Sequence, residues 1–148
     1  MRRNYAELSV DPLSAAFARR HVGRVLASWG RGELIEAAEL VISELVTNAL
    51  KAAVGSPAVA DPYIWIGLHQ ANGRVVLEVW DPCRTPPRRV DAGPDALGGR
   101  GLLLVEDLAA EWGYRWPRTG GKVVWAALAE GSAESGKDAV SGAGRIDA

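Results

Sequence analysis

The chain has 148 residues, 48% of them hydrophobic and 24% charged, which indicates one globular domain with a core large enough to fold without disulfide staples. The formal net charge of -1 excludes a general attraction to nucleic acid or to an anionic membrane, and the single cysteine, Cys83, excludes an internal disulfide. No apolar run reaches the length of a signal peptide or a membrane-spanning helix, so we expect a cytoplasmic protein without direct nucleic-acid or membrane partners.

The first part of the chain predicts a strand followed by a helix. Residues 5–10 form a short mixed segment that suits an edge strand. Asp11 and Pro12 then suit a helix N-cap and the first helical position. Apolar residues recur at helical spacing as far as Trp29, and Gly30 ends the run.

The middle of the chain predicts a long helix, a hairpin and an irregular segment. The helix covers about residues 33–54, because apolar side chains keep to one of its sides. Two strands, near 63–68 and 74–80, flank the dipeptide Asn72-Gly73, which is typical of tight hairpins. The prolines and glycines of residues 81–100 indicate a long loop, of the kind that often forms a functional lid.

The last elements complete a layered fold. A short third helix is predicted over 102–111, and two closing strands over 112–116 and 123–128. Strands joined by tight turns make a mixed, mostly antiparallel sheet, and three helices on one face make the fold an α+β two-layer sandwich. We expect residues 1–130 to form this domain. Residues 131–148, which are mostly small or charged, are predicted to be a disordered tail.

The long helix also carries a polar stripe. At about 100° per residue, Glu44, Asn48 and Lys51 fall within one narrow stripe at the border of the apolar side. A carboxylate one turn from an amide oxygen can hold magnesium or its water, because phosphate and water supply the remaining ligands. A lysine one turn further can meet a phosphate. The same three residues equally suit a solvated helix face, and spacing alone favours that interpretation.

Four short motifs together resemble those of the histidine-kinase-like (GHKL) ATPase superfamily. The run from Glu44 to Leu50 resembles its N-box, and Asp81 at a strand end resembles its G1 box. Gly99-Arg100-Gly101-Leu102 resembles its G2 box, and Gly120-Gly121-Lys122 stands where the family has a turn into the last strand. The motifs occur in the family's order over about residues 5–130, and this conjunction is specific.

The resemblance implies a role for each matching residue. Asn48 would coordinate the Mg²⁺ that bridges the phosphates of ATP, and Glu44 would orient or deprotonate the attacking hydroxyl. Asp81 would accept a hydrogen bond from the adenine amino group. The glycines would let the backbone approach the phosphates at a helix start. The further residues predicted to bind the nucleotide are Lys51, Cys83, Gly99, Arg100, Gly101, Leu102 and Lys122.

Two features depart from the family pattern. The G1 box usually reads Asp-x-Gly-x-Gly, and Cys83 and Thr85 occupy its glycine positions. A positive φ at Cys83 would cost energy that a glycine avoids. Many relatives follow the N-box with a histidine where this chain has Ala52. Both departures concern nucleotide affinity and lid closure more than the fold.

Within the superfamily, the short length and the phrases "SELVTNAL" and "GRGLLLVEDLAAEWGY" resemble the anti-sigma-factor and serine-kinase branch. The resemblance implies an ATP-binding anti-sigma regulator with protein serine kinase activity. Its partners would be a sigma factor and a small anti-anti-sigma (STAS-type) protein whose serine receives the γ-phosphate. A homodimer is compatible with this branch. His21 lacks the residues that follow a phospho-acceptor histidine, and we interpret it as a surface or half-buried helix histidine.

Two other functional interpretations stay open at this stage. The domain could be a non-catalytic binding module, in which bound ATP only sets the affinity for a partner protein. Alternatively, it could be a degenerate domain that no longer binds nucleotide.

Overall fold

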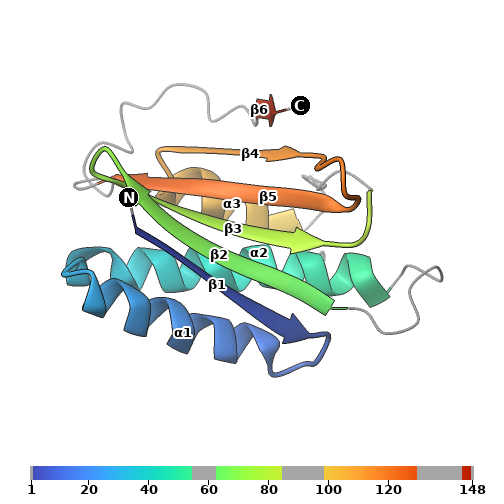
Figure 1. Ribbon diagram of the computed structural model, residues 1–148, viewed down its shortest axis with the longest axis horizontal. Helices are drawn as coiled ribbons and strands as arrows, with labels where there is room; N and C mark the ends of the chain where they lie inside the picture. Colours follow the sequence, from blue (N-terminus) through green and yellow to red (C-terminus); the bar gives the residue numbers. More distant parts are fainter. Residues whose placement is uncertain (1, 55–62, 85–98, 130–144, 148) are drawn as a thin grey trace.

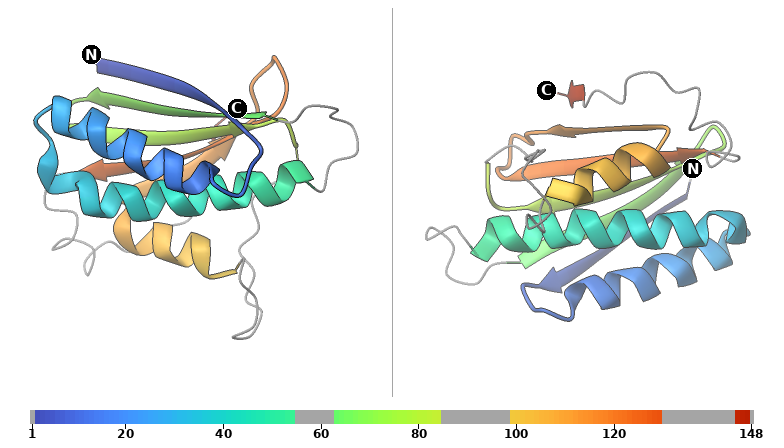
Figure 2. Two further views of the ribbon diagram at one scale, coloured as in Figure 1. Left: turned by 90° about the horizontal axis from the view of Figure 1, so that it is seen from below. Right: turned by 180° about the vertical axis from the view of Figure 1, so that it is seen from behind.

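The structure, a computed structural model, describes residues 2–54, 63–84, 99–129 and 145–147. One sheet forms a layer, and the helices cover one of its faces (Figure 1 and Figure 2). In chain order the elements are β1 (Arg2–Ser9), α1 (Ser14–Ser28), a 3-10 turn (Gly32–Leu34), α2 (Ile35–Val54), β2 (Tyr63–Ala71), β3 (Arg74–Asp81), α3 (Gly99–Leu108), β4 (Glu111–Arg115), β5 (Lys122–Ala129) and β6 (Arg145–Asp147).

The strands lie in the order β1-β2-β3-β5-β4-β6. The first five form antiparallel pairs with their neighbours, and β6 pairs in parallel with β4. With α1, α2 and α3 on one side, this arrangement confirms the predicted α+β two-layer sandwich with a mixed, mostly antiparallel sheet (Figure 2). The predicted edge strand is also confirmed and is longer than expected, since β1 pairs with β2 along all eight of its residues.

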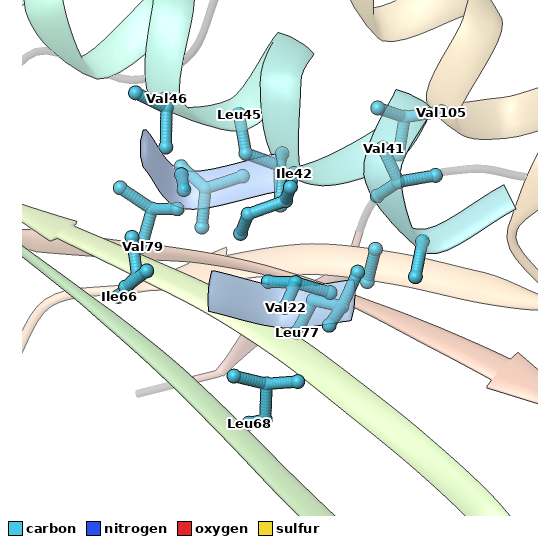
Figure 3. Close-up of a cluster of buried hydrophobic side chains, with 14 of the residues drawn as sticks. Val22, Val41, Ile42, Leu45, Val46, Ile66, Leu68, Leu77, Val79 and Val105 are labelled. Atoms are coloured by element: carbon cyan, nitrogen blue, oxygen red, sulfur yellow. The ribbon is translucent and has the colours of Figure 1, made fainter. Parts of the chain in front are cut away.

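The core lies between the sheet and α2. Alternate side chains of β2 and β3 point toward the helices, while one side of α2 packs down onto them (Figure 3). These side chains are aliphatic and almost fully removed from water, so their burial is the main stabilising contribution to the fold. They include Val41, Ile42, Leu45 and Val46 of α2, Ile64, Ile66 and Leu68 of β2, and Leu77 and Val79 of β3.

The turn between β2 and β3 confirms the predicted hairpin. Asn72 and Gly73 have φ angles of 55° and 76°, the left-handed conformation that this dipeptide tolerates. The start of α1 differs from the prediction, because its N-cap is Leu13 and not Asp11. The Asp11 carboxylate instead accepts a hydrogen bond from the Leu13 N–H at 2.7 Å, two residues ahead in a local turn.

The third helix was predicted three residues too late at both ends. It begins at Gly99 and ends at Leu108, so Glu111 belongs to β4 and not to the helix. Burial of Leu102 and Val105 against the core holds the first turns in place, and this packing outweighs the low helix propensity of the glycines. The first and last residues of α3 are therefore set by its packing against neighbouring elements, which the local sequence does not show.

Arg145–Asp147 forms a strand, which corrects the prediction that residues 131–148 are disordered throughout. Without this pairing β4 would expose the backbone groups of an edge strand, and three residues are too few to give a pattern of their own. The rest of that tail lies outside the described residues, as does most of the predicted lid. Over the described ranges, no helix is long and apolar enough to cross a membrane.

His21 joins α1 to the edge strand of the sheet. Its Nε2 lies 2.6 Å from Asn4 Oδ1, and its ring stacks on Phe17 with centroids 6.2 Å apart. The ring is half-buried, as the sequence suggested. Burial, and then the positive charge of Arg24, lower the pKa of His21 from its usual 6.5. The folded protein therefore takes up this proton less readily than the unfolded chain does.

This difference in proton affinity makes the stability depend on pH. We expect the stability advantage of the unmodified protein over His21→Gln to be largest at about pH 8 and to shrink toward about pH 5. The contribution of His21 is fully present above pH 6.5. It is lost as the pH falls from there through the lowered pKa of His21 in the folded protein, because the unfolded chain is protonated first. Urea denaturation of both proteins over this pH range measures the effect. An advantage that stays constant across the range contradicts it.

Candidate functional site

The predicted polar stripe lies at the border of the buried side of α2. Glu44 and Asn48 are half-buried, and Lys51 is exposed near the C-terminal end of the helix. The neighbouring Leu45 and Ala49 are buried in the core, which fixes the rotation of α2 about its axis. Two oxygen-bearing side chains one helical turn apart therefore lie at the border of the buried side of α2, a helix that packs against α1, β3 and α3.

Asp81 lies at the C-terminal end of β3 and is 1% exposed. Its Oδ1 accepts a hydrogen bond of 2.9 Å from the Cys83 N–H, and its Oδ2 lies 3.2 Å from Lys122 Nζ. Lys122 is itself only 4% exposed, and it is the partner of Asp81 in the antiparallel register of β3 and β5. A carboxylate and an ammonium group are thus buried side by side at one end of the central strands.

The environment of Asp81 pulls its pKa in opposite directions. Burial raises the pKa above its usual value, because a charge is poorly solvated inside a protein. The charge of Lys122 and the hydrogen bond from the Cys83 N–H both lower it, and burial is the larger effect. Lys122 thus offsets part of the cost of keeping the Asp81 carboxylate ionised.

The backbone after Asp81 adopts an unstrained turn. Across the described ranges, positive φ angles occur at Asn72 and at Gly30, Gly73, Gly120 and Gly121, and not at Cys83. The expected cost of a positive φ at Cys83 therefore does not arise. Its N–H instead closes a local turn on the Asp81 side chain, as Asp side chains often do. Thr85, at the other altered glycine position, lies outside the described residues.

Two glycines hold the start of β5 against the end of β3. Gly120 and Gly121 have φ angles of 105° and 73°, and the Trp80 Nε1–H donates a hydrogen bond of 2.9 Å to the Gly120 carbonyl. A Cβ added at Gly121 would overlap the Asp81 carbonyl oxygen and the Trp80 ring. The close approach of this turn is therefore what sets Lys122 directly opposite Asp81.

The predicted G2 motif forms the first turn of α3, which packs alongside α2 (Figure 2). Gly99, Arg100 and Gly101 have helical backbone there, so their N–H groups belong to a helix start, where anions can bind. Leu102 is fully buried in the core. Its side chain packs against the core, and nucleotide binding by Leu102 stays a prediction.

In the structure, Asp81 contacts both Cys83 and Lys122. The polar stripe of α2 and the first turn of α3 belong to two helices that pack against each other. The sequence analysis predicts that Lys122 binds the nucleotide, but it does not predict that Lys122 forms an ion pair with Asp81. Trp80, which anchors the glycine turn, was missed entirely. For Lys122 the sequence did contain a signal. Side chains alternate along β5, so Lys122 points to the same side as the buried residues Val124, Ala126 and Leu128.

A two-layer fold with a carboxylate buried at a strand end, a polar helix border and a glycine-opened helix defines an ATP-binding domain of the histidine-kinase-like class. The sequence matches the histidine kinase-like ATPase domain family over residues 8–128, and the chain belongs to that family. None of the curated proteins matches the chain. ATP binding, which in this kind of domain typically involves Mg²⁺, is therefore the general function that family membership supports.

Replacing Gly121 tests the role of the glycine turn. Gly121→Ala should lower the free energy of unfolding by about 2–4 kcal/mol, because it combines a left-handed conformation with steric overlap. Gly73→Ala is the matched control, since Gly73 has nearly the same φ of 76° but open space around its Cα. It should lose only about 1–2 kcal/mol. Equal losses in urea denaturation would show that the contact with β3 is unimportant.

Proposed function

We propose that this protein is an ATP-dependent anti-sigma regulator with protein serine kinase activity. It transfers the γ-phosphate of ATP to a serine of a small anti-anti-sigma (STAS-type) protein, and it sequesters a sigma factor when that protein is phosphorylated. The observation that carries the proposal is the combination of family membership over residues 8–128 with the N-box stripe, Glu44 and Asn48, at the border of α2.

Asp81 selects the nucleotide in this proposal. Its buried carboxylate accepts a hydrogen bond from the amino group of adenine. Guanine has a carbonyl oxygen at the same ring position, which would leave two acceptors facing each other. Because Asp81 is almost fully shielded from water, such a mismatch cannot be relieved by solvent and costs more than at a surface.

The donor set on α2 suits magnesium that arrives with ATP. Asn48 supplies an amide oxygen and Glu44 a carboxylate one turn away, and hard oxygen ligands of this kind are those that Mg²⁺ prefers. Asn48 would hold the ion, with the phosphates and water as its other ligands. Bound magnesium supplies charge neutralisation along the phosphates.

Glu44 prepares the attacking hydroxyl group. The serine oxygen of the partner forms a bond to the γ-phosphorus as the bond from that phosphorus to the β–γ bridging oxygen breaks, and ADP leaves with that oxygen. The hydroxyl proton passes to the Glu44 carboxylate. Phosphoryl transfer depends mostly on positioning and charge stabilisation, so a single oriented carboxylate is an adequate protein contribution.

Nucleotide selection gives the first test of this proposal. Calorimetry should show that the unmodified protein binds Mg-ATP more tightly than Mg-GTP. Asp81→Ala should lose about 1.5–3 kcal/mol of ATP binding free energy, as expected for a hydrogen bond to a charged group. Asp107→Ala, which removes an exposed carboxylate on α3, serves as the control and should bind like the parent. Equal affinity for ATP and GTP in the parent contradicts the role of Asp81.

The chemical step gives the second test. The partner is identified by pull-down with and without Mg-ATP, followed by mass spectrometry of the captured proteins and of their serines. Purified protein, Mg-ATP and this partner should then give phosphoserine. Glu44→Ala should reduce the transfer rate by about 10²-fold or more while retaining nucleotide. Glu36→Ala, on the exposed side of the same helix, should leave the rate unchanged. Transfer at the parental rate in Glu44→Ala rules out its role.

One observation favours a non-catalytic alternative. The segment after β3 is held at two points, by the Cys83 N–H on Asp81 and by the Trp116 Nε1–H, which donates to the Arg84 carbonyl at 3.2 Å. The segment that follows β3 is held by these two hydrogen bonds, so it is stiffer than the glycine-containing motif that the family usually has there. In this alternative, bound ATP only sets the affinity for a partner. Partner binding that responds to ATP, without any phosphoserine formed, distinguishes this function from kinase activity.

A further inference from the structure

The buried pair of Asp81 and Lys122 is not explained by the needs of the fold. The inward faces of β3 and β5 are otherwise aliphatic, and a buried ion pair can commonly be replaced by apolar residues of similar volume without loss of stability. A lysine that is 4% exposed therefore calls for a functional reason. The other buried side chains on these two faces are Val75, Leu77, Val79, Val124, Ala126 and Leu128.

The backbone directs Lys122 toward Asp81 with little freedom. The two residues are partners in the β3–β5 register, and the alternation of β5 turns the Lys122 side chain inward. Gly121 packs closely against the Asp81 carbonyl and the Trp80 ring, and the hydrogen bond from the Trp80 Nε1–H to the Gly120 carbonyl holds the start of β5 there. The Lys122 Nζ is consequently held 3.2 Å from Asp81 Oδ2.

The two side chains present an acceptor beside a donor. A carboxylate can only accept hydrogen bonds, and an ammonium group can only donate them, up to three in number. The Cys83 N–H on Oδ1 and Lys122 on Oδ2 together fix the orientation of the Asp81 carboxylate. Adenine offers the complementary pattern, because its amino group donates and the ring nitrogens N1 and N7 on either side of that group accept.

We propose that Lys122 is a second base-reading residue, which donates a hydrogen bond to a ring nitrogen beside the adenine amino group while Asp81 accepts one from the amino group itself. This inference rests on the proposed adenine site at Asp81. If the nitrogen is N1, the pair rejects guanine twice, since the guanine N1–H would face the ammonium group and its carbonyl would face the carboxylate.

Two ATP analogues test the inference directly. In 1-deaza-ATP and 7-deaza-ATP a C–H group replaces one ring nitrogen, and the amino group is kept. One of the two should bind the unmodified protein about tenfold or more weakly than ATP, as expected for a lost hydrogen bond to a charged donor. Which analogue is affected identifies the nitrogen. If neither analogue binds more weakly than ATP, Lys122 reads no ring nitrogen.

Substitutions then assign the effect to Lys122. In Lys122→Met the affected analogue and ATP should bind alike, because the donor is gone. Lys122→Gln keeps a donor without the charge and should retain part of the difference. Arg118→Met removes an exposed cation from the same β4–β5 connection and should preserve the full difference. Thermal unfolding of each variant confirms that it is folded, and the comparison of analogues on the unmodified protein does not depend on the variants.

The outcomes separate this inference from the proposed function. If Lys122→Met weakens ATP and both analogues by one common factor, Lys122 only supports Asp81 through its charge, and the base-reading role is overturned while the ATP site stands. If the unmodified protein binds no ATP at all, the adenine site and this inference fall together. A loss specific to one analogue that disappears in Lys122→Met supports both.

Discussion

The antiparallel pairing of β3 with β5 is the contact on which both the fold and the site depend. These strands are separated in sequence by the predicted lid, α3 and β4, yet they form the centre of the sheet. Their register places aliphatic side chains under the helices along most of its length, and it places Asp81 opposite Lys122 at one end. Association of the apolar surfaces supplies the driving force, and the charged pair is carried into the interior by the same register.

The orientation of α2 about its own axis determines both which of its side chains enter the core and which lie at the polar border. Its buried side makes the largest helical contribution to the core, and the adjacent border presents Glu44 and Asn48. Since close packing locks the buried side, the core sets the position of these border residues. Changes of volume at core positions such as Ile42 or Leu45 would therefore move the proposed magnesium ligand as well as reduce stability (Figure 3).

The two faces of the sheet differ in chemistry. The face toward the helices is mostly aliphatic, with the Asp81–Lys122 pair at one end and with Asn4 on β1 and Trp112 and Tyr114 on β4. The outward face carries exposed aromatic side chains, among them Tyr5, Tyr63 and Trp65. On the outward face Glu78 is paired with Arg115 at 3.1 Å, and the Tyr5 ring lies across Gly67. The nucleotide site that we propose lies on the helix side of the sheet, at the strand ends that border it.

The sequence alone determined the fold class, the order of the helices and strands as far as β5, and the identity of the residues that resemble the ATPase motifs. These features are local, because hydrophobic periodicity defines α2 and the strands, and Asn72-Gly73 defines the hairpin. Only the tertiary structure decided that Lys122 meets Asp81, that Leu102 belongs to the core and that β4 gains a neighbour in β6. Each of these depends on contacts between elements that are not consecutive in the chain, and no short run of sequence encodes such a contact.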